Sequence, residues 1–259
     1  RDPGDVLGPD RWDAAEMRRK RAVVGERDWA SLYQQRPAPD EGEIFKRMHW
    51  RYWQPRGAKL PPVTVTMGDG SVSEVEPVEL PARFDEMVQS WDLAFKDTAA
   101  SDFVAGLIVG RAGANKYLLD YINDRLDIVA SMAAIEHWAT KWPKAIAKLI
   151  EDKANGPAVI QMMRGKVAGL LPITPEGGKI SRAYAAQPEV QSGNVFLPHP
   201  NLAAWTNEFI NNAAAFPNAA HDDDVDAFTQ ALIRWQAGGG PVTAGAQVTS
   251  EAQVKEMFG

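Results

Sequence analysis

Four acidic residues stand where secondary-structure elements are expected to begin or end. Asp92 and Glu151 each close an apolar stretch, and Asp223 and Asp226 lie three apart in the acidic run at 222–226. Carboxylates that converge without basic partners repel one another unless a cation binds between them. Oxygen ligands favour hard ions such as Mg²⁺ or Mn²⁺, so the pattern predicts a metal-dependent enzyme that acts on phosphate esters.

Each of these acids also has an ordinary structural interpretation. Asp92 could simply end a strand, and Glu151 could form a surface ion pair with Lys148 or Lys153. The aspartates at 222–224 could cap a helix, where an acid interacts with the helix dipole by about 0.3–1 kcal/mol. One cap requires one aspartate, however, and four acids within five positions create repulsion that capping does not require. The excess favours a metal site.

Length and composition limit the class of protein. A chain of 259 residues that is 45% hydrophobic can form one main domain with appendages. The absence of cysteine excludes disulfides, thiolate zinc sites and cysteine nucleophiles. No apolar run approaches the roughly 20 residues that cross a bilayer, so we expect a soluble protein without a membrane partner. The first residues, Arg1-Asp2-Pro3-Gly4, resemble neither a signal peptide nor a native start, and we expect a fragment.

The net charge of -6 argues against a broad nucleic-acid-binding surface, because such surfaces are usually basic. Bound cations would neutralise part of this acidity. Local basic residues could also follow a nucleic-acid backbone, and they cluster at Arg164, Lys166, Lys179 and Arg182.

Before residue 84 the sequence is typical of connecting segments. Apolar residues at helical spacing predict a helix within 10–36, which Pro37-Ala38-Pro39 ends. The stretch 55–82 is rich in proline, and its turn at 67–70 separates two alternating segments, which predicts a small hairpin.

From residue 86 the pattern changes to a compact alternation of strands and helices. The expected strands cover 87–93, 103–110, 116–122, 145–151, 169–173 and, as an edge strand, 194–198; the expected helices cover 127–142, 155–164, 178–187, 201–213 and 222–236. A helical crossover from the third strand to the fourth implies parallel neighbours in a mixed sheet. If the crossover places the fourth strand beside the first, Asp92 and Glu151 meet at one edge and the last helix must begin over it. The polar tail that follows is expected to be mobile.

The motifs in these segments resemble the C-terminal nuclease domain of the large terminase subunit of tailed bacteriophages. The resemblance covers roughly residues 84–236, and the connector-like segment 29–42 adds to it. Its motifs, in order, are SWDLAFK at 90–96, IEDKANG at 150–156, GKISRA at 178–183, GNVFLP at 193–198 and HDDDVDA at 221–227.

The resemblance implies an α/β fold similar to ribonuclease H, with a mixed sheet of five to six strands flanked by helices after an N-terminal helical and linker segment. It divides the chain into a connector at 1–54 that follows an ATPase domain, a proline-rich linker with a hairpin at 55–83, a nuclease domain at 84–237 and a flexible tail at 238–259.

The implied activity is endonucleolytic cutting of concatemeric double-stranded viral DNA during genome packaging, in the host bacterial cytoplasm and not in the mature virion. Two Mg²⁺ or Mn²⁺ ions would hydrolyse the phosphodiester bond without a side-chain nucleophile. The portal and the small terminase subunit would be partners of the full-length protein.

Residue by residue, the resemblance assigns Asp92, Glu151, Asp223 and Asp226 as catalytic metal ligands. It leaves Asp222 as an uncertain additional ligand and gives no metal role to Asp224, where the family more often has a neutral residue. His221 would hold the start of the helix. The residues expected to contact DNA are Lys153, Lys179 and Arg182; their ordinary interpretation is surface charge.

Two other functions remain open at this point. Another ribonuclease H-like enzyme, such as a resolvase or transposase, would share the metal site. A non-catalytic docking module of the packaging motor would instead use the tail at 238–259 and the hairpin at 63–80. ATPase activity is not expected, because Gly177-Gly178-Lys179-Ile180 lacks the glycine spacing and the hydroxyl of a phosphate-binding loop.

Overall fold

The computed structural model describes residues 44–67, 70–93, 102–153, 156–219, 222–236 and 246–247. The chain divides into two compact units, Arg1–Asp40 and Glu41–Gly259, and every described residue belongs to the second. The helix predicted within 10–36 and nearly all of the tail at 238–259 therefore lie outside the described residues.

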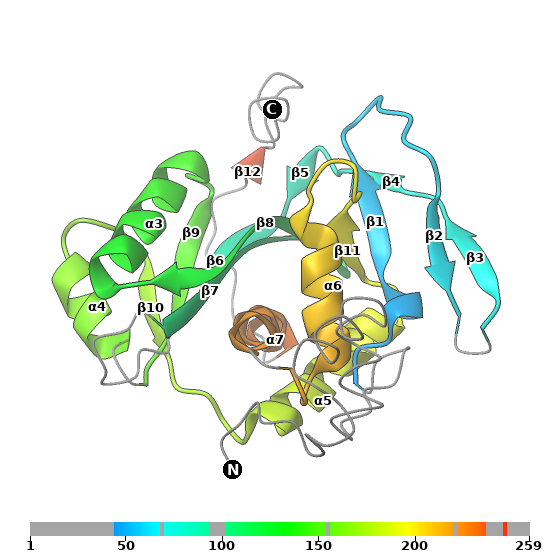
Figure 1. Cartoon of the computed structure of the whole chain (residues 1–259). Coiled ribbons are helices and arrows are strands. Elements are labelled where there is room, and N and C mark those ends of the chain that lie inside the picture. Colours follow the sequence, from blue (N-terminus) through cyan, green and yellow to red (C-terminus); the bar gives the residue numbers. More distant parts are fainter. Residues whose placement is uncertain are drawn as a thin grey trace, which may run out of the picture. The chain divides into compact units, whose positions relative to one another are not determined.

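An eight-stranded mixed sheet forms the centre of this unit, with the strand order β10-β9-β6-β7-β8-β11-β1-β4 (Figure 1). The pairs β6–β7 and β7–β8 are antiparallel and the others are parallel. The strands are β1 (Arg51–Gln54), β4 (Val78–Glu79), β6 (Glu86–Asp92), β7 (Asp102–Ala112), β8 (Asn115–Leu126), β9 (Ala145–Glu151), β10 (Leu170–Ile173) and β11 (Val195–Pro198). The predicted fold class, a mixed α/β sheet flanked by helices, is confirmed.

Helices cover both faces of the sheet. They are α3 (Ile128–Lys141), α4 (Gly156–Met163), α5 (Lys179–Gln191), α6 (Trp205–Ala215) and α7 (Asp223–Gln236), with a 3₁₀ turn η1 at Arg47–His49. One hydrophobic core joins the sheet to residues of α5, α6 and α7, and a second core joins its other face to residues of α3 and α4 (Figure 1).

Period-two alternation along the central strands produces these two cores. On β6, Val88 belongs to the core under α7, whereas Met87 and Trp91 belong to the core under α3 and α4. Trp91 lies opposite Gly106 of β7, where any Cβ atom would collide with the indole ring. Glycine at this position therefore makes room for the tryptophan at the end of β6.

The sheet is larger than predicted, because two strands before residue 84 join it. β1 pairs in parallel with β11, and the buried indole of Trp53 donates a hydrogen bond of 2.8 Å to the carbonyl oxygen of Leu118 on β8. β4 then adds to the outer side of β1. Strands from the segments 1–54 and 55–83 thus take part in the main sheet.

The same pairing corrects the prediction for residues 194–198. The sequence predicts an edge strand there, but the segment, β11, lies between β8 and β1 and all four of its residues are buried. Coverage by β1, from a distant part of the sequence, accounts for the difference.

Two short pairings lie outside the main sheet. The predicted hairpin is confirmed as β2 (Val63–Thr66) paired antiparallel with β3 (Val72–Val75). β12 (Ala246–Gln247) pairs antiparallel with β5 (Arg83–Phe84). Among the described helices, none has the length and apolar character needed to cross a membrane.

Candidate active site

Asp92 and Glu151 end two adjacent parallel strands. β6 and β9 pair in parallel with Trp91 opposite Ile150, so the residue that follows each of them lies at the same edge of the sheet. Gly156 begins α4 directly against this edge, because a Cβ atom there would collide with the carbonyl oxygen of Glu151. The first and fourth predicted strands, β6 and β9, are therefore neighbours in the sheet, as the predicted site required.

Polar contacts attach α7 to these strands. The hydroxyl of Ser90 donates a hydrogen bond of 2.6 Å to the carbonyl oxygen of Ala227. Gln230 Nε2 donates to Ser90 Oγ at 3.0 Å and to the carbonyl oxygen of Leu149 at 3.3 Å. Sequence reasoning missed both side chains; the available signal was a glutamine four residues after Asp226, on the same helix face.

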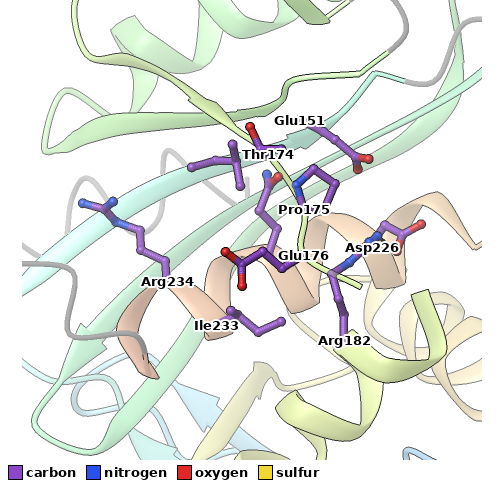
Figure 2. Close-up of a pocket in the computed structure, with 10 residues that line it drawn as sticks. Glu151, Thr174, Pro175, Glu176, Arg182, Asp226, Ile233 and Arg234 are labelled. Atoms are coloured by element: carbon purple, nitrogen blue, oxygen red, sulfur yellow. Dashed lines mark hydrogen bonds and ion pairs between the residues drawn. The ribbon is translucent and has the colours of Figure 1, made fainter. Parts of the chain in front are cut away.

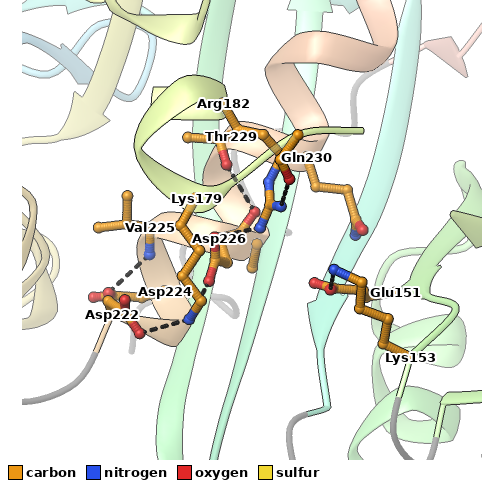
Figure 3. A network of polar contacts seen from close by, with 12 residues as sticks. Glu151, Lys153, Lys179, Arg182, Asp222, Asp224, Val225, Asp226, Thr229 and Gln230 are labelled. Atoms are coloured by element: carbon orange, nitrogen blue, oxygen red, sulfur yellow. Dashed lines mark hydrogen bonds and ion pairs between the residues drawn. The ribbon is translucent and has the colours of Figure 1, made fainter. Parts of the chain in front are cut away.

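Asp226 is buried and contacts two cations of α5 (Figure 3). Arg182 Nη2 donates to Asp226 Oδ1 at 2.6 Å. Lys179 Nζ lies 2.6 Å from Asp226 Oδ2 and 2.8 Å from Asp222 Oδ1. The first of these Lys179 contacts is an ion pair without hydrogen-bond geometry, since Asp226 Oδ2 accepts no hydrogen bond among the described residues.

The three residues predicted to contact DNA thus all lie beside acids. Lys153 Nζ is 3.5 Å from Glu151 Oε1, and its side chain is exposed. This contact is the ion pair with Lys153 that the sequence indicates as the alternative role of Glu151. The Arg182 side chain is only 8% exposed. The alternative interpretation of this residue as an ordinary surface charge is therefore wrong. A phosphate contact by any of the three stays a prediction.

Asp92 is a buried acid on which several like charges act. Burial raises its pKa well above the usual value, and the charges of Asp226, Glu151 and Asp223 raise it further, while Lys179 opposes them. Its carboxylate makes no hydrogen bond or ion pair with any residue in the described ranges. The four predicted ligands therefore lie close enough to act on one another.

The pKa values of Asp223 and Lys179 show the same mutual influence. The pKa of Asp223 is raised, first by burial, with Lys179 opposing and Asp222 adding to the rise. Burial lowers the pKa of Lys179, but its contacts with Asp222 and Asp226 outweigh burial and raise it overall. Lys179 thus supplies positive charge to several acids at once.

The donor set suits a hard divalent cation, but the side chains are not yet arranged around one. All candidate ligands offer oxygen, and buried Asp226 Oδ2 accepts no hydrogen bond among the described residues. In this part of the chain, no three acidic or histidine side chains are placed to hold a metal ion together. The cations of α5 occupy Asp226 instead. His221 lies outside the described residues.

Asp224 has a different environment from its neighbours. It is fully buried, and its Oδ2 accepts hydrogen bonds of 2.9 Å from Tyr121 Oη and from Asn212 Nδ2. Its Oδ1 accepts from the backbone N–H of Val225 at 2.8 Å (Figure 3). Burial raises the pKa of Asp224 to about 6, although these hydrogen bonds lower it. Asp224 therefore anchors α7 to α6 and β8 and does not face the other acids.

A cavity of about 360 Å³ opens beside Glu151 and Asp226 (Figure 2). It runs along α7 past Gln230 to Ile233 and Arg234, and the segment 173–176 forms its opposite wall. Glu151 and Asp226 therefore line a hollow of the size that binds small ligands.

Comparison with known proteins agrees with this architecture. A family model described as the Terminase RNaseH-like domain matches residues 89–234, which is more than half of the chain. No curated protein matches. The solved nuclease of the large terminase from thermophilic phage G20c, with bound magnesium, has a TM-score of 0.51 and 10% identity, over 76% of this chain and 99% of that one.

Other solved structures show lower similarity. The g2p (large terminase) nuclease domain from bacteriophage SPP1, with bound Mn, gives a TM-score of 0.43 at 12% identity, over 59% of this chain and 88% of that one. The large terminase from a second thermophilic bacteriophage gives 0.46 at 8% identity over 59% of this chain, and the match spans only 40% of that terminase. At such identities the structures show the fold alone, and the match to the family model establishes the relationship: the chain belongs to the family of terminase RNaseH-like domains.

Proposed function

We propose that this chain is the nuclease part of a large terminase and that it hydrolyses phosphodiester bonds of double-stranded DNA with divalent cations. The observation that supports the proposal is that Asp92 is buried at the end of β6, beside the end of β9, and that the charges of Glu151, Asp223 and Asp226 act on it. A buried carboxylate whose pKa is strongly perturbed by its neighbours is typical of a functional site. The similar nuclease of the large terminase from phage G20c has bound magnesium, which supports the choice of ion.

Asp92, Glu151, Asp223 and Asp226 would hold two Mg²⁺ or Mn²⁺ ions, with Asp222 as an additional ligand. Such ions lower the pKa of a bound water and neutralise charge on a phosphate. Catalysis then requires no side-chain nucleophile.

The protein's own residues have the task of placing these ligands. Ser90 and Gln230 hold the start of α7 against the ends of β6 and β9, so that Asp226 lies near Asp92. Lys153, which is exposed beside Glu151, would contact a backbone phosphate. Because the chain carries a net charge of -6, binding to DNA should be weak and sensitive to salt.

In the full-length protein we propose that this activity cuts concatemeric viral DNA during packaging, in the host cytoplasm. An ATPase domain, the portal and the small terminase subunit would act with it. These proposals follow from family membership and concern a longer protein than the chain described.

The direct test is cleavage of a linear DNA duplex of arbitrary sequence in Mg²⁺, in Mn²⁺ and in EDTA. We expect cutting only with divalent cation, and Asp92→Ala or Asp223→Ala should reduce it at least about a hundredfold while circular dichroism stays unchanged. Glu136→Gln is the matched control, because it removes one negative charge from an exposed side chain of α3 that lies 4.0 Å from Lys166. Undiminished cutting by either alanine variant would refute the assignment. Cutting restricted to branched junctions would instead favour a resolvase.

A further inference from the structure

Two cations of α5 serve the same buried carboxylate but differ in accessibility. Lys179 and Arg182 are three residues apart on one helix face, and both contact Asp226. The side chain of Lys179 is 46% exposed, whereas that of Arg182 is 8% exposed. One cation is therefore open to solvent and the other is enclosed.

Arg182 is held in place from two sides. Its Nη2 donates to Asp226 Oδ1 at 2.6 Å, and its Nη1 donates to the carbonyl oxygen of Gly177 at 3.4 Å. Moving this guanidinium away would leave buried Asp226 without its hydrogen-bonded partner, which is costly. Arg182 is thus a permanent part of the fold.

Lys179 has no comparable structural reason for its position. It is the first residue of α5, where the positive end of the helix dipole disfavours a cation. Its ammonium lies between Asp222 and Asp226 and bridges them. Its pair with partly exposed Asp222 contributes only about 0.2–1 kcal/mol, whereas loss of its pair with buried Asp226 is compensated when another cation takes the place of the ammonium.

A divalent cation and this ammonium cannot both occupy Asp226 Oδ2. Asp226 has two carboxylate oxygens, and each already contacts a cation of α5. A metal ion at Oδ2 would meet the ammonium, which lies 2.6 Å from that oxygen, and like charges at such distances repel strongly. Departure of Lys179 frees oxygens on Asp222 and Asp226 together.

We propose that Lys179 is the exchangeable counter-cation of the acid cluster formed by Asp92, Glu151, Asp222, Asp223 and Asp226. It neutralises Asp222 and Asp226 in the metal-free protein and leaves them when a divalent cation binds, while Arg182 stays. The released ammonium, on a flexible stem, is then free to contact a DNA phosphate. The proposal rests on the proposed function, since it requires that the cluster bind divalent cations.

The test measures binding of Mn²⁺ alone, without DNA, to the chain of residues 1–259. Free Mn²⁺ is counted by electron paramagnetic resonance and the affinity is confirmed by calorimetry. In Lys179→Met the metal no longer competes with an ammonium, so we expect about tenfold tighter Mn²⁺ binding than in the wild type. In EDTA the variant should melt at a lower temperature than the wild type, and Mn²⁺ should raise its melting temperature by more.

Lys166→Met is the matched control, because Lys166 is exposed and lies 4.0 Å from Glu136, away from the acid cluster. It should bind Mn²⁺ as the wild type does. Lys179→Gln, which keeps a hydrogen-bond donor but not the charge, provides a second variant if Lys179→Met does not fold, and it should also bind Mn²⁺ more tightly.

The outcomes separate this proposal from the proposed function. Equal or weaker Mn²⁺ binding by the Lys179 variants, with normal binding by the wild type, would overturn the counter-cation role and leave the nuclease proposal standing. Failure of all the proteins, wild type included, to bind Mn²⁺ would overturn both.

Discussion

The two ends of β6 carry buried acids in opposite circumstances. Glu86, at the first end, is balanced: Arg234 Nη2 donates to its Oε1 at 3.1 Å, and the indole N–H of Trp235 donates to its Oε2 at 2.8 Å. Asp92, at the other end, is equally buried, but the carboxylates of Asp226, Glu151 and Asp223 raise its pKa further, and Lys179 opposes them. One helix, α7, supplies residues to both ends.

This difference separates an acid that stabilises the fold from one that costs stability. A buried carboxylate with a guanidinium and an indole donor has its charge and its hydrogen bonds satisfied. A buried carboxylate among like charges stores unfavourable energy that a bound cation relieves. Strain of this second kind persists where a protein uses it.

The largest expected effect on stability comes from removing Glu86, the buried acid with hydrogen-bonded partners. Glu86→Ala leaves the largely buried Arg234 without its partner, so we expect the free energy of unfolding to fall by about 3–5 kcal/mol. Urea denaturation in EDTA measures this change. Glu136→Ala, at an exposed site of α3, should change stability by less than about 0.5 kcal/mol. If Glu86→Ala is as stable as this control, Glu86 does not stabilise the fold and the contrast with Asp92 fails.

Asp224 sharpens the comparison, because it is buried and hydrogen-bonded by neutral donors alone. Its pKa of about 6 lies above the unfolded value of 3.8. The stability it contributes is therefore fully present below pH 3.8 and is lost as the pH rises through about 6. The unfolding free energy of the wild type, measured relative to that of Asp224→Asn, should therefore fall by about 3 kcal/mol as the pH rises across this window.

Thermal or urea unfolding of both proteins at several pH values measures that difference. Asp92 and Asp223 titrate in wild type and variant alike, so their contributions largely cancel. A difference that is constant with pH would show that Asp224 ionises normally in the folded protein.

A smaller effect, of opposite sign to that of Glu86→Ala, is expected at Asp92. Its raised pKa means that the wild type loses stability as the pH rises from the unfolded value of 3.8 through the higher folded value. Asp92→Asn removes the charge, so in EDTA at neutral pH it should be more stable than the wild type, and the gap should widen with pH. The gain in stability is limited because the buried side-chain amide of the asparagine still requires hydrogen-bond partners.

Addition of Mn²⁺ should reverse the order of stability, because only the wild type keeps the full set of ligands. Lower stability of Asp92→Asn in EDTA would contradict the view that this carboxylate is destabilising in the metal-free protein.

Much of the site could be predicted because its geometry follows from local patterns. The apolar run before Glu151 predicts β9 with its observed bounds, and the helical crossover predicts parallel neighbours in a mixed sheet. The sequence allows β9 to lie beside β6, and the observed pairing of these strands brings Asp92 and Glu151 to one edge. The position of Asp226 then needs only the start of α7.

The remaining features depend on partners that are distant in sequence. β1 and β4 have four and two residues, too few for a periodic signal, and they become strands because they pair beside β11. Arg182 resembles surface charge in the sequence because nothing near it reveals Asp226, 44 residues away. Charge patterns identify candidate residues, but only tertiary contacts decide whether a cation faces an acid or the solvent.

The attachment of α7 along β6 has a final consequence. Asp226 and Arg234 are eight residues apart on α7, about 12 Å at the rise of an α-helix, and each contributes to a different end of the strand. A slip of α7 by a single residue would turn its side chains by about 100° and disturb both ends together. A wrongly docked α7 would therefore disturb the ion pair of Glu86 and the acids of the candidate site together, so this one helix couples the stability of the fold to the geometry of the site.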